Sequence, residues 1–251
     1  MNVANSVERS IIDCRIERVD SLVEYIHVLQ RGFFKDSVLF RGQRADWPLL
    51  PELLRSTVKL KAPREIVERE AFEHFRRTAL PFVGSKVTSN WDWLVLAQHH
   101  GLPTRLLDWT RNPLAALWFT VRKPGEKGLD GVVWAFRYKN RELVDTERNK
   151  DPFEATGVKV LRPVHIAGRV VSQSAWFTVH TFLQSSRLVQ AIGFEGQWHP
   201  DVLTKVLVPP DAFAEIRSEL NCCGINEAML FPDMDGLCRH IRWQFTRLSD
   251  E

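Results

Sequence analysis

The sequence predicts an α+β protein, because helical and strand-like segments follow one another without a regular βαβ repeat. The first half of the chain shows mainly helical periodicity, with apolar residues three and four positions apart. The second half carries short runs rich in β-branched and aromatic residues, which are typical of strands. No internal repeat divides the chain, so we expect one domain over 1–251, with a helical lead-in over 1–36 and a domain core over 37–245.

Four helices are expected in the first half of the chain, over residues 22–31, 65–79, 90–100 and 114–121. Ser21 and Glu24 form a capping box that opens the first of them. Asn112 followed by Pro113 is an N-cap with proline at the first helical position, and it opens the last.

The expected strands cover residues 37–41, 131–136, 158–161, 177–182, 203–208 and 229–231. Between them, residues 140–156 are polar and aperiodic, which predicts an exposed excursion. A helix begins at Pro210-Asp211 and ends before Gly224. A last helix is expected to begin at Asp235, with an apolar face turned inward that consists of Leu237, Ile241 and Phe245.

Composition and charge exclude several classes of protein. The chain has 251 residues, with 34 basic and 31 acidic side chains and a formal net charge of +3. This balance is not that of a disordered chain or of a dedicated nucleic-acid binder, although a local basic groove stays possible. The absence of a long apolar run, of a secretory signal and of paired Cys-x-x-Cys motifs predicts a cytoplasmic protein with reduced thiols and no membrane partner.

The segment Phe40-Arg41-Gly42-Gln43 is the first candidate for a binding site. An arginine at the end of a strand, next to a glycine, presents a planar cation where backbone can approach an anion closely, which suits phosphate or pyrophosphate. The alternative is an arginine that simply reaches water or a neighbouring carboxylate from the strand end.

The loop after the third helix is the second candidate. It carries His100, Thr104, Arg105, Asp108 and Thr110, and a proline and a glycine constrain it. Constrained loops of this polarity are common at binding sites. The alternative is that Arg105 and Asp108 pair with each other, while His100 interacts with the negative end of its helix.

Two further polar groups lie in the second half of the chain. Gln173 lies beside strand-like residues, where it is either a site residue or a buried amide that ties two backbone segments. Glu227 precedes Asp233 and Asp235, which fit turn and helix-capping roles. No metal site is expected, and the absence of Walker, G-x-S-x-G, G-x-G-x-x-G and H-E-x-x-H motifs disfavours the hydrolases, NTPases and metalloenzymes that carry them.

Four ordered motifs together resemble the FRG domain family. They are Phe40-Arg41-Gly42, the run from Gln98 to Thr110 that continues through Asn112-Pro113 to Phe119, the element that begins at Gln173, and residues 230–236. The resemblance covers about residues 37–245. Many members of this family come from bacterial or phage-related genomes, which implies a role in conflict or defence.

A second resemblance is to the ADP-ribosyltransferase fold, whose members carry an aromatic-Arg-Gly on the first strand. It implies two small mixed or antiparallel sheets that form a cleft flanked by helices, with NAD as substrate. Phe40, Arg41 and Gly42 match the first motif, and Thr110 stands where these enzymes carry a serine. Gln173 lies where the family's catalytic glutamate is expected, so Glu227 is the alternative acid.

The resemblance implies a role for each of these residues. Arg41 would hold the pyrophosphate of NAD, and Phe40 or Trp109 would pack the nicotinamide. Gln173 or Glu227 would orient the ribose. Only a carboxylate would strongly stabilise the positive charge that develops when the nicotinamide bond breaks.

The sequence therefore favours an NAD-dependent ADP-ribosyltransferase-like effector, such as a toxin or an anti-phage defence protein. Its partners would be the dinucleotide, a macromolecular acceptor (nucleic acid or protein) and a neutralising protein. The alternative is a non-catalytic module that recognises a nucleotide, a nucleic acid or a phage protein. A nuclease or nucleotide hydrolase that uses His100 and Asp108 is a third hypothesis.

Overall fold

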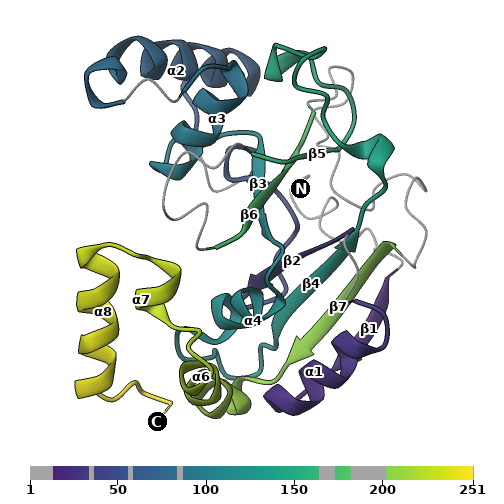
Figure 1. The fold of residues 1–251 in the computed structure, drawn as a ribbon, viewed down its shortest axis with the longest axis vertical. Helices are drawn as coiled ribbons and strands as arrows, with labels where there is room; N and C mark the ends of the chain where they lie inside the picture. Colours follow the sequence, from purple (N-terminus) through teal and green to yellow (C-terminus); the bar gives the residue numbers. More distant parts are fainter. Residues whose placement is uncertain are drawn as a thin grey trace, which may run out of the picture.

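The computed structural model describes residues 14–33, 37–55, 59–83, 87–163, 173–181 and 202–250. Within these ranges a single mixed sheet of seven strands carries helices, which confirms the predicted α+β class. Figure 1 shows the sheet running through the whole molecule. Its strands, in spatial order, are β1 (Arg15–Arg18), β7 (Leu203–Val208), β4 (Gly131–Arg137), β2 (Val38–Gln43), β3 (Leu106–Thr110), β6 (Ala175–Val179) and β5 (Lys159–Leu161).

The described strands form one sheet and not the two small sheets expected from the sequence, but the junction in its centre is narrow. Six residue pairs join β2 to β4, and five join β3 to β6. By contrast, β2 and β3 are paired only at Phe40 and Thr110. The two halves of the sheet therefore part directly after Phe40, at the position of Arg41.

Helices cover both halves of the sheet on the same face. On the first half, α1 (Leu22–Gln30), α4 (Pro113–Val121) and α6 (Phe213–Cys222) pack over Phe40 and its neighbours in one apolar core. On the other half, α2 (Arg64–Thr78) and α3 (Asn90–His99) belong to a second core with Leu106. Paired residues of an antiparallel sheet point to the same side, and side chains alternate along a strand. The Phe40–Thr110 pair therefore places Leu106 on the face of Phe40.

The opposite face of the sheet is largely aromatic. Trp109, Trp134, Phe136, Tyr138 and Trp176 are buried there in one core that extends across the junction between β2 and β3. These aromatic side chains hold the two halves together where main-chain pairing is sparse.

Several predicted helix ends are confirmed by their hydrogen bonds. The Ser21 side chain accepts from the Glu24 main-chain N at the start of α1. The Asn112 side chain accepts from Leu114 N and Ala115 N at the start of α4. The polar stretch over 140–156 contains two of the short 3-10 turns of the structure, which are η2 (Glu52–Leu54), η3 (Leu80–Phe82), η4 (Asn140–Glu142), η5 (Pro152–Glu154) and η7 (Pro210–Ala212).

Two elements differ from the prediction near the start of the chain and in its second half. Residues 15–18 of the expected helical lead-in form β1, which pairs in parallel with β7. Residues 1–13 of that lead-in and residue 182 of the expected strand 177–182 lie outside the described residues. The expected strand over 229–231 is wrong, because residues 227–230 form the short helix α7 (Glu227–Leu230), whose cap is the side chain of Asn226.

The last helix, α8 (Met234–Phe245), also differs from the prediction. Asp233 caps it and not Asp235, since Gly236 N donates to Asp233 Oδ1 at 2.7 Å. The expectation that Leu237, Ile241 and Phe245 point inward is wrong, because all three are exposed. Gly236 is the buried residue of this helix, and a Cβ there would overlap the carbonyl oxygen of Phe231. The side of α8 that contains Gly236 therefore packs against the rest of the protein.

Among the described helices, none has both the length and the apolar composition that crossing a bilayer requires. None of the four cysteines forms a disulfide with another described residue.

Candidate functional site

Arg41 lies where β2 and β3 part, and its side chain bridges them. Its Nη1 donates to the main-chain oxygen of Asp108 at 2.8 Å and lies 3.9 Å from Asp108 Oδ2. The Arg41 side chain is only 16% exposed, and its Nε is buried without a hydrogen-bond partner among the described residues. A guanidinium thus takes the place of main-chain pairing in the opening between the strands.

The electrostatics of Arg41 favour an anion nearby. Burial lowers the pKa of the Arg41 guanidinium, and the positive charge of Arg55 lowers it further, whereas Asp108 raises it. An anion beside the guanidinium would offset the cost of burying this charge.

Asp108 connects Arg41 to the surface. Its carboxylate is 57% exposed, and Gln98 Nε2 donates to Asp108 Oδ2 at 3.2 Å. Thr104 Oγ1 in turn donates to Gln98 Oε1 at 2.7 Å, which fixes the orientation of the amide. His100 is exposed at the C-cap of α3. The alternative in which Arg105 pairs with Asp108 is wrong, because a chain of polar contacts runs instead from Thr104 through Gln98 to Asp108 and Arg41.

Gln173 lies near the same junction, but its side chain holds the fold. Its main-chain oxygen accepts from Thr110 Oγ1 at 2.5 Å, beside the Phe40–Thr110 pair. Its Nε2 donates to the main-chain oxygen of Leu230 at 3.0 Å. The amide therefore ties the start of β6 to α7, which is the structural alternative that the sequence left open.

Other expected ligand-binding residues near Arg41 have structural partners. Phe40 is buried in the core under α4. A Cβ on Gly42 would overlap the carbonyl oxygen of Ala116, so the glycine allows close approach of α4 to β2. Gln43 Oε1 accepts from Trp134 Nε1, and Trp109 Nε1 donates to Thr178 Oγ1, both at 2.9 Å.

Arg105 forms a buried ion pair with Glu68 on α2. The two side chains are 3% and 1% exposed. Arg105 Nε and Nη2 donate to Glu68 Oε2 at 2.9 and 2.8 Å, and the Arg105 main-chain N donates to Glu68 Oε1 at 2.8 Å. Every oxygen of the carboxylate is thus engaged, and the guanidinium is unavailable to a ligand.

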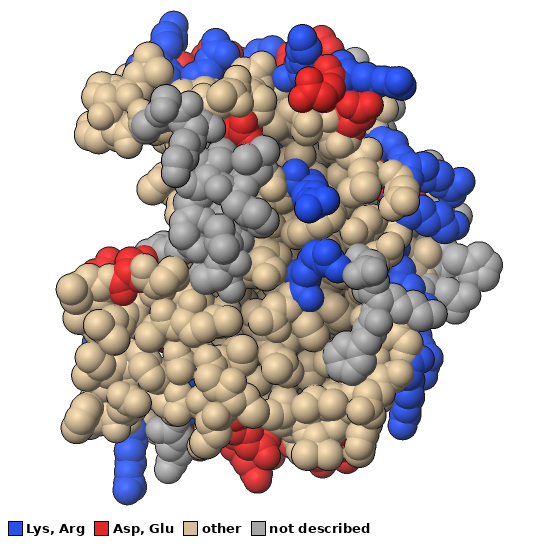
Figure 2. All heavy atoms as spheres, in the orientation of Figure 1, with Lys and Arg blue, Asp and Glu red and all other residues tan. Residues whose placement is uncertain are grey.

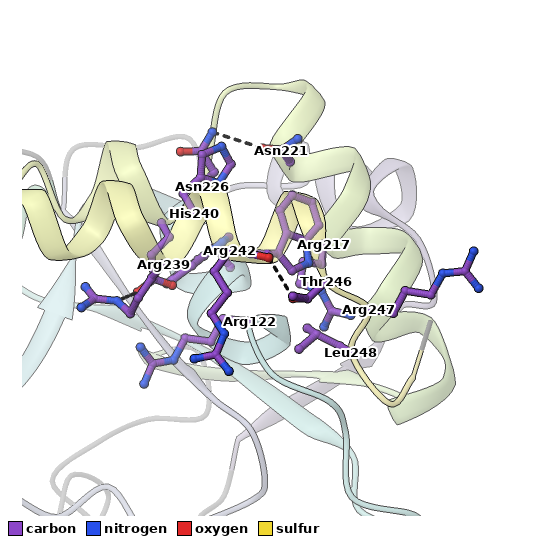
Figure 3. Close-up of a pocket in the computed structure, with 13 residues that line it drawn as sticks. Arg122, Arg217, Asn221, Asn226, Arg239, His240, Arg242, Thr246, Arg247 and Leu248 are labelled. Atoms are coloured by element: carbon purple, nitrogen blue, oxygen red, sulfur yellow. Dashed lines mark hydrogen bonds and ion pairs between the residues drawn. The ribbon is translucent and has the colours of Figure 1, made fainter.

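Glu227 does not join these residues but lies in a separate pocket of about 320 Å³. Figure 3 shows this pocket, whose lining comes from the end of α4, from α6, from the start of α7, from α8 and from the chain after α8. We call it the arginine pocket, and its lining residues are Trp118, Arg122, Arg217, Asn221, Asn226, Glu227, Arg239, His240, Arg242, Trp243, Thr246, Arg247 and Leu248.

The arginine pocket has an excess of positive charge, because five of its lining residues are arginines and only one is acidic. Arg239 Nε donates to Glu227 Oε1 at 2.7 Å. Arg217 Nη2 lies 2.8 Å from Asp250 Oδ1, and its Nη1 donates to the main-chain oxygen of Val121. The remaining arginines are Arg122, Arg242 and Arg247.

Arg122 and Arg242 both line the pocket, and neither has an ion-pair partner among the described residues. Figure 3 shows them on the same side of the pocket as Arg239, with Arg247 directed away. Burial lowers the pKa of Arg122, Glu227 raises it, and Arg44 and Arg239 lower it. The pKa of Arg239 is raised, chiefly by its hydrogen bond to Glu227. The positive charges of Arg44 and Arg239 therefore disfavour the charge on Arg122, and an anion beside Arg122 would relieve this repulsion.

Aromatic rings accompany the charges in the arginine pocket. The guanidinium carbon of Arg122 lies 5.9 Å from the ring centre of Trp118. The rings of His240 and Trp243 are stacked, with centres 5.9 Å apart. Sequence reasoning missed this pocket, although the spacing of Arg239, His240 and Trp243 by three and four positions places them on one face of a helix.

The described residues contain no cluster of three or more histidine, cysteine, aspartate or glutamate side chains arranged to hold a metal ion.

In a comparison with known protein families, the segment around Arg41 matches one family model. The family model of the FRG domain matches residues 36–128, so the chain carries an FRG domain there. The matched part contains β2, α2, α3, β3 and α4, and with them the Phe40-Arg41-Gly42 motif and the run from Gln98 to Phe119. Gln173, Glu227 and most of the arginine pocket lie outside it. The chain has no significant match among curated proteins or among solved structures.

Proposed function

We propose that the protein binds a phosphate-bearing nucleotide in the arginine pocket, either as a free nucleotide or as the end of a nucleic-acid strand. The observation that carries the proposal is that two guanidiniums, those of Arg122 and Arg242, line a pocket of about 320 Å³ without an ion-pair partner among the described residues. Guanidiniums bind phosphate oxygens through two parallel hydrogen bonds, and their charge persists at neutral pH.

The shape and lining of the pocket fit the rest of a nucleotide. Pockets for small ligands start at about 300 Å³, so the arginine pocket is large enough for a phosphate with part of its sugar and base. The stacked rings of His240 and Trp243 provide an aromatic surface beside the charges. Bases stack on such surfaces with little dependence on sequence.

Fluorescence anisotropy tests this function with a short, 5′-phosphorylated and 3′-labelled RNA as probe and unlabelled ATP as competitor. Arg122→Ala and Arg242→Ala should each weaken binding about tenfold or more, since a hydrogen bond to a charged group contributes about 1.5–3 kcal/mol. Arg77→Ala is the matched control, because it removes one exposed charge from α2, far from the pocket. Competition by ATP indicates a site for free nucleotides, whereas binding of the RNA without competition by ATP indicates a strand-end site. Absence of binding to either probe, or equal binding by all variants, would refute the proposal.

A second candidate function is the NAD-dependent ADP-ribosyltransferase-like activity, and the opening between β2 and β3 favours it. The opening begins at the Phe40–Thr110 pair and contains Arg41. A sheet that parts at this point fits an ADP-ribosyltransferase-like cleft, in which the cation of Arg41 would receive the pyrophosphate of NAD. The reaction would transfer ADP-ribose to a macromolecular acceptor, release nicotinamide and pass one proton from the acceptor to solvent.

Such a reaction needs an acidic side chain close to Arg41 that can stabilise the ribosyl cation. Gln173 is engaged with Leu230, and Glu227 with Arg239. Asp108, at 3.9 Å, is the acidic side chain that forms an ion pair with Arg41. We therefore assign to Asp108 the stabilisation of the ribosyl cation in this second candidate.

The test is incubation with labelled NAD and cell lysate. Nicotinamide release that is lost in Arg41→Ala and Asp108→Asn, but kept in Arg122→Ala, would support the transferase. Absence of release and of transferred label would exclude it. Roles as a toxin or an anti-phage effector, and a neutralising partner, rest on this activity. Four cysteines without a disulfide among the described residues fit a reducing compartment, and we propose a cytoplasmic location.

A further inference from the structure

Helix α8 carries an apolar stripe on its outer face. Met234, Leu237, Ile241 and Phe245 are 72%, 44%, 43% and 84% exposed. Their spacing of three and four residues places them on one side of the helix. A surface helix ordinarily turns its apolar side toward the core and its charged side to water, so α8 has the opposite orientation.

The inner face of α8 is already occupied. Gly236 packs against Phe231, and Arg239, His240 and Trp243 line the arginine pocket. At about 100° per residue, the stripe lies on the side of the helix opposite to these four residues. Rotating the helix to bury the stripe would break the packing of Gly236 on Phe231 and the hydrogen bond from Arg239 to Glu227, so burial of the stripe requires a partner from outside the described fold.

We propose that the stripe pairs with the stripe of a second copy of this chain, with the two α8 helices antiparallel. Around a twofold axis near the middle of the helix, Met234 of each copy would lie opposite Phe245 of the other. Leu237 would lie opposite Ile241 in the same arrangement. Such a self-complementary order is what a twofold interface requires, because the same patch must match itself.

Charge favours the antiparallel orientation. Asp233 and Asp235 lie at the start of α8, whereas Arg242 and Arg247 lie near its end. In Figure 2 the surface over α8 is largely uncharged between red atoms above and blue atoms below. Antiparallel pairing brings the acidic start of one helix beside the basic end of the other and also aligns opposite ends of the helix dipoles. A parallel pair would place like charges together at both ends.

The expected dimer is weak. A helix of 12 residues is about 18 Å long, and its four apolar side chains cover much less than the roughly 800 Å² per partner of a standard interface. We therefore expect an association that depends on protein concentration. The apolar side chains of the stripe lie on the side of α8 opposite to Gly236, Arg239, His240 and Trp243, so their burial in the dimer needs no ligand in the pocket.

Sedimentation velocity over a series of protein concentrations tests the proposal without nucleotide. The parent protein should shift from monomer to dimer as concentration rises. Ile241→Glu should remain monomeric, because it places two like charges in the interface. Ile66→Glu is the matched control, since Ile66 is similarly exposed on α2 and lies away from the stripe. A parent protein that is monomeric at every concentration, or an Ile241→Glu variant that dimerises like the parent, would overturn the proposal.

Cross-linking through Cys238 tests the antiparallel register. Cys238 is exposed beside the stripe, close to the proposed axis. With helix axes about 8–10 Å apart, the two Cys238 side chains of the dimer lie within about 10 Å, which a short bismaleimide spans. The triple variant Cys14→Ser/Cys222→Ser/Cys223→Ser should give a covalent dimer, and the addition of Ile241→Glu should abolish it. A dimer by sedimentation that gives no cross-link would contradict this register.

Discussion

Removing Glu68 should destabilise the protein strongly, because it leaves Arg105 charged and buried. The two side chains are 1% and 3% exposed, and Glu68 accepts from two nitrogens of the guanidinium and from the Arg105 main chain. Removing one partner of a buried pair costs about 3–5 kcal/mol. With an unfolding entropy of about 2.1 cal/mol/K per residue, 251 residues give about 0.5 kcal/mol/K, so Glu68→Ala should lower Tm by about 6–10 °C.

Thermal unfolding followed by circular dichroism measures this change. The double variant Glu68→Leu/Arg105→Met is the matched control, because it replaces the pair by apolar side chains of similar size and should recover much of the loss. If Glu68→Ala unfolded within about 1 °C of the parent, a level of change typical of surface substitutions, the structural role assigned to Arg105 would be refuted and its use by a ligand would become the better explanation.

Three further changes test the junction of the sheet and its helices. Gly42→Ala should destabilise the protein by about 1–3 kcal/mol, because the added methyl meets the carbonyl oxygen of Ala116; unchanged urea unfolding would refute this close approach. Gln43→Leu leaves Trp134 Nε1 buried without its acceptor and should cost about 1–3 kcal/mol in the same assay, whereas a neutral effect would show that the bond is dispensable. Asn112→Ala removes the cap of α4 and should cost about 1 kcal/mol, while Asn112→Ser should retain most of the stability; equal losses in both would contradict the capping role.

Local sequence signals predicted the parts of the fold that local interactions determine. The caps at Ser21 and Asn112 lie within three residues of the groups they bind, and both were predictable. The strand 203–208 was predictable in the same way, since its β-branched residues Thr204, Val206 and Val208 recur at every second position.

The contacts at the candidate sites are non-local, and the sequence alone did not show them. The partner of Arg105 is Glu68, which lies 37 positions earlier. Arg41 binds the main-chain oxygen of a residue 67 positions away, and a main-chain oxygen carries no sequence signature. The periodicity of α8 was visible, but the side of the helix that faces the protein is set by Gly236 and the neighbouring arginines. The apolar side of α8 was therefore predicted to be buried, whereas it is exposed.

The salt dependence of RNA binding tests the central claim, that the arginine pocket receives phosphate, most directly. The logarithm of the affinity for the 5′-phosphorylated RNA should fall linearly with the logarithm of the salt concentration. Arg242→Ala should weaken binding and reduce the magnitude of this slope by about one, since one phosphate contact is lost, while Arg77→Ala should leave the slope unchanged. The same affinity and slope in all three proteins would contradict the account.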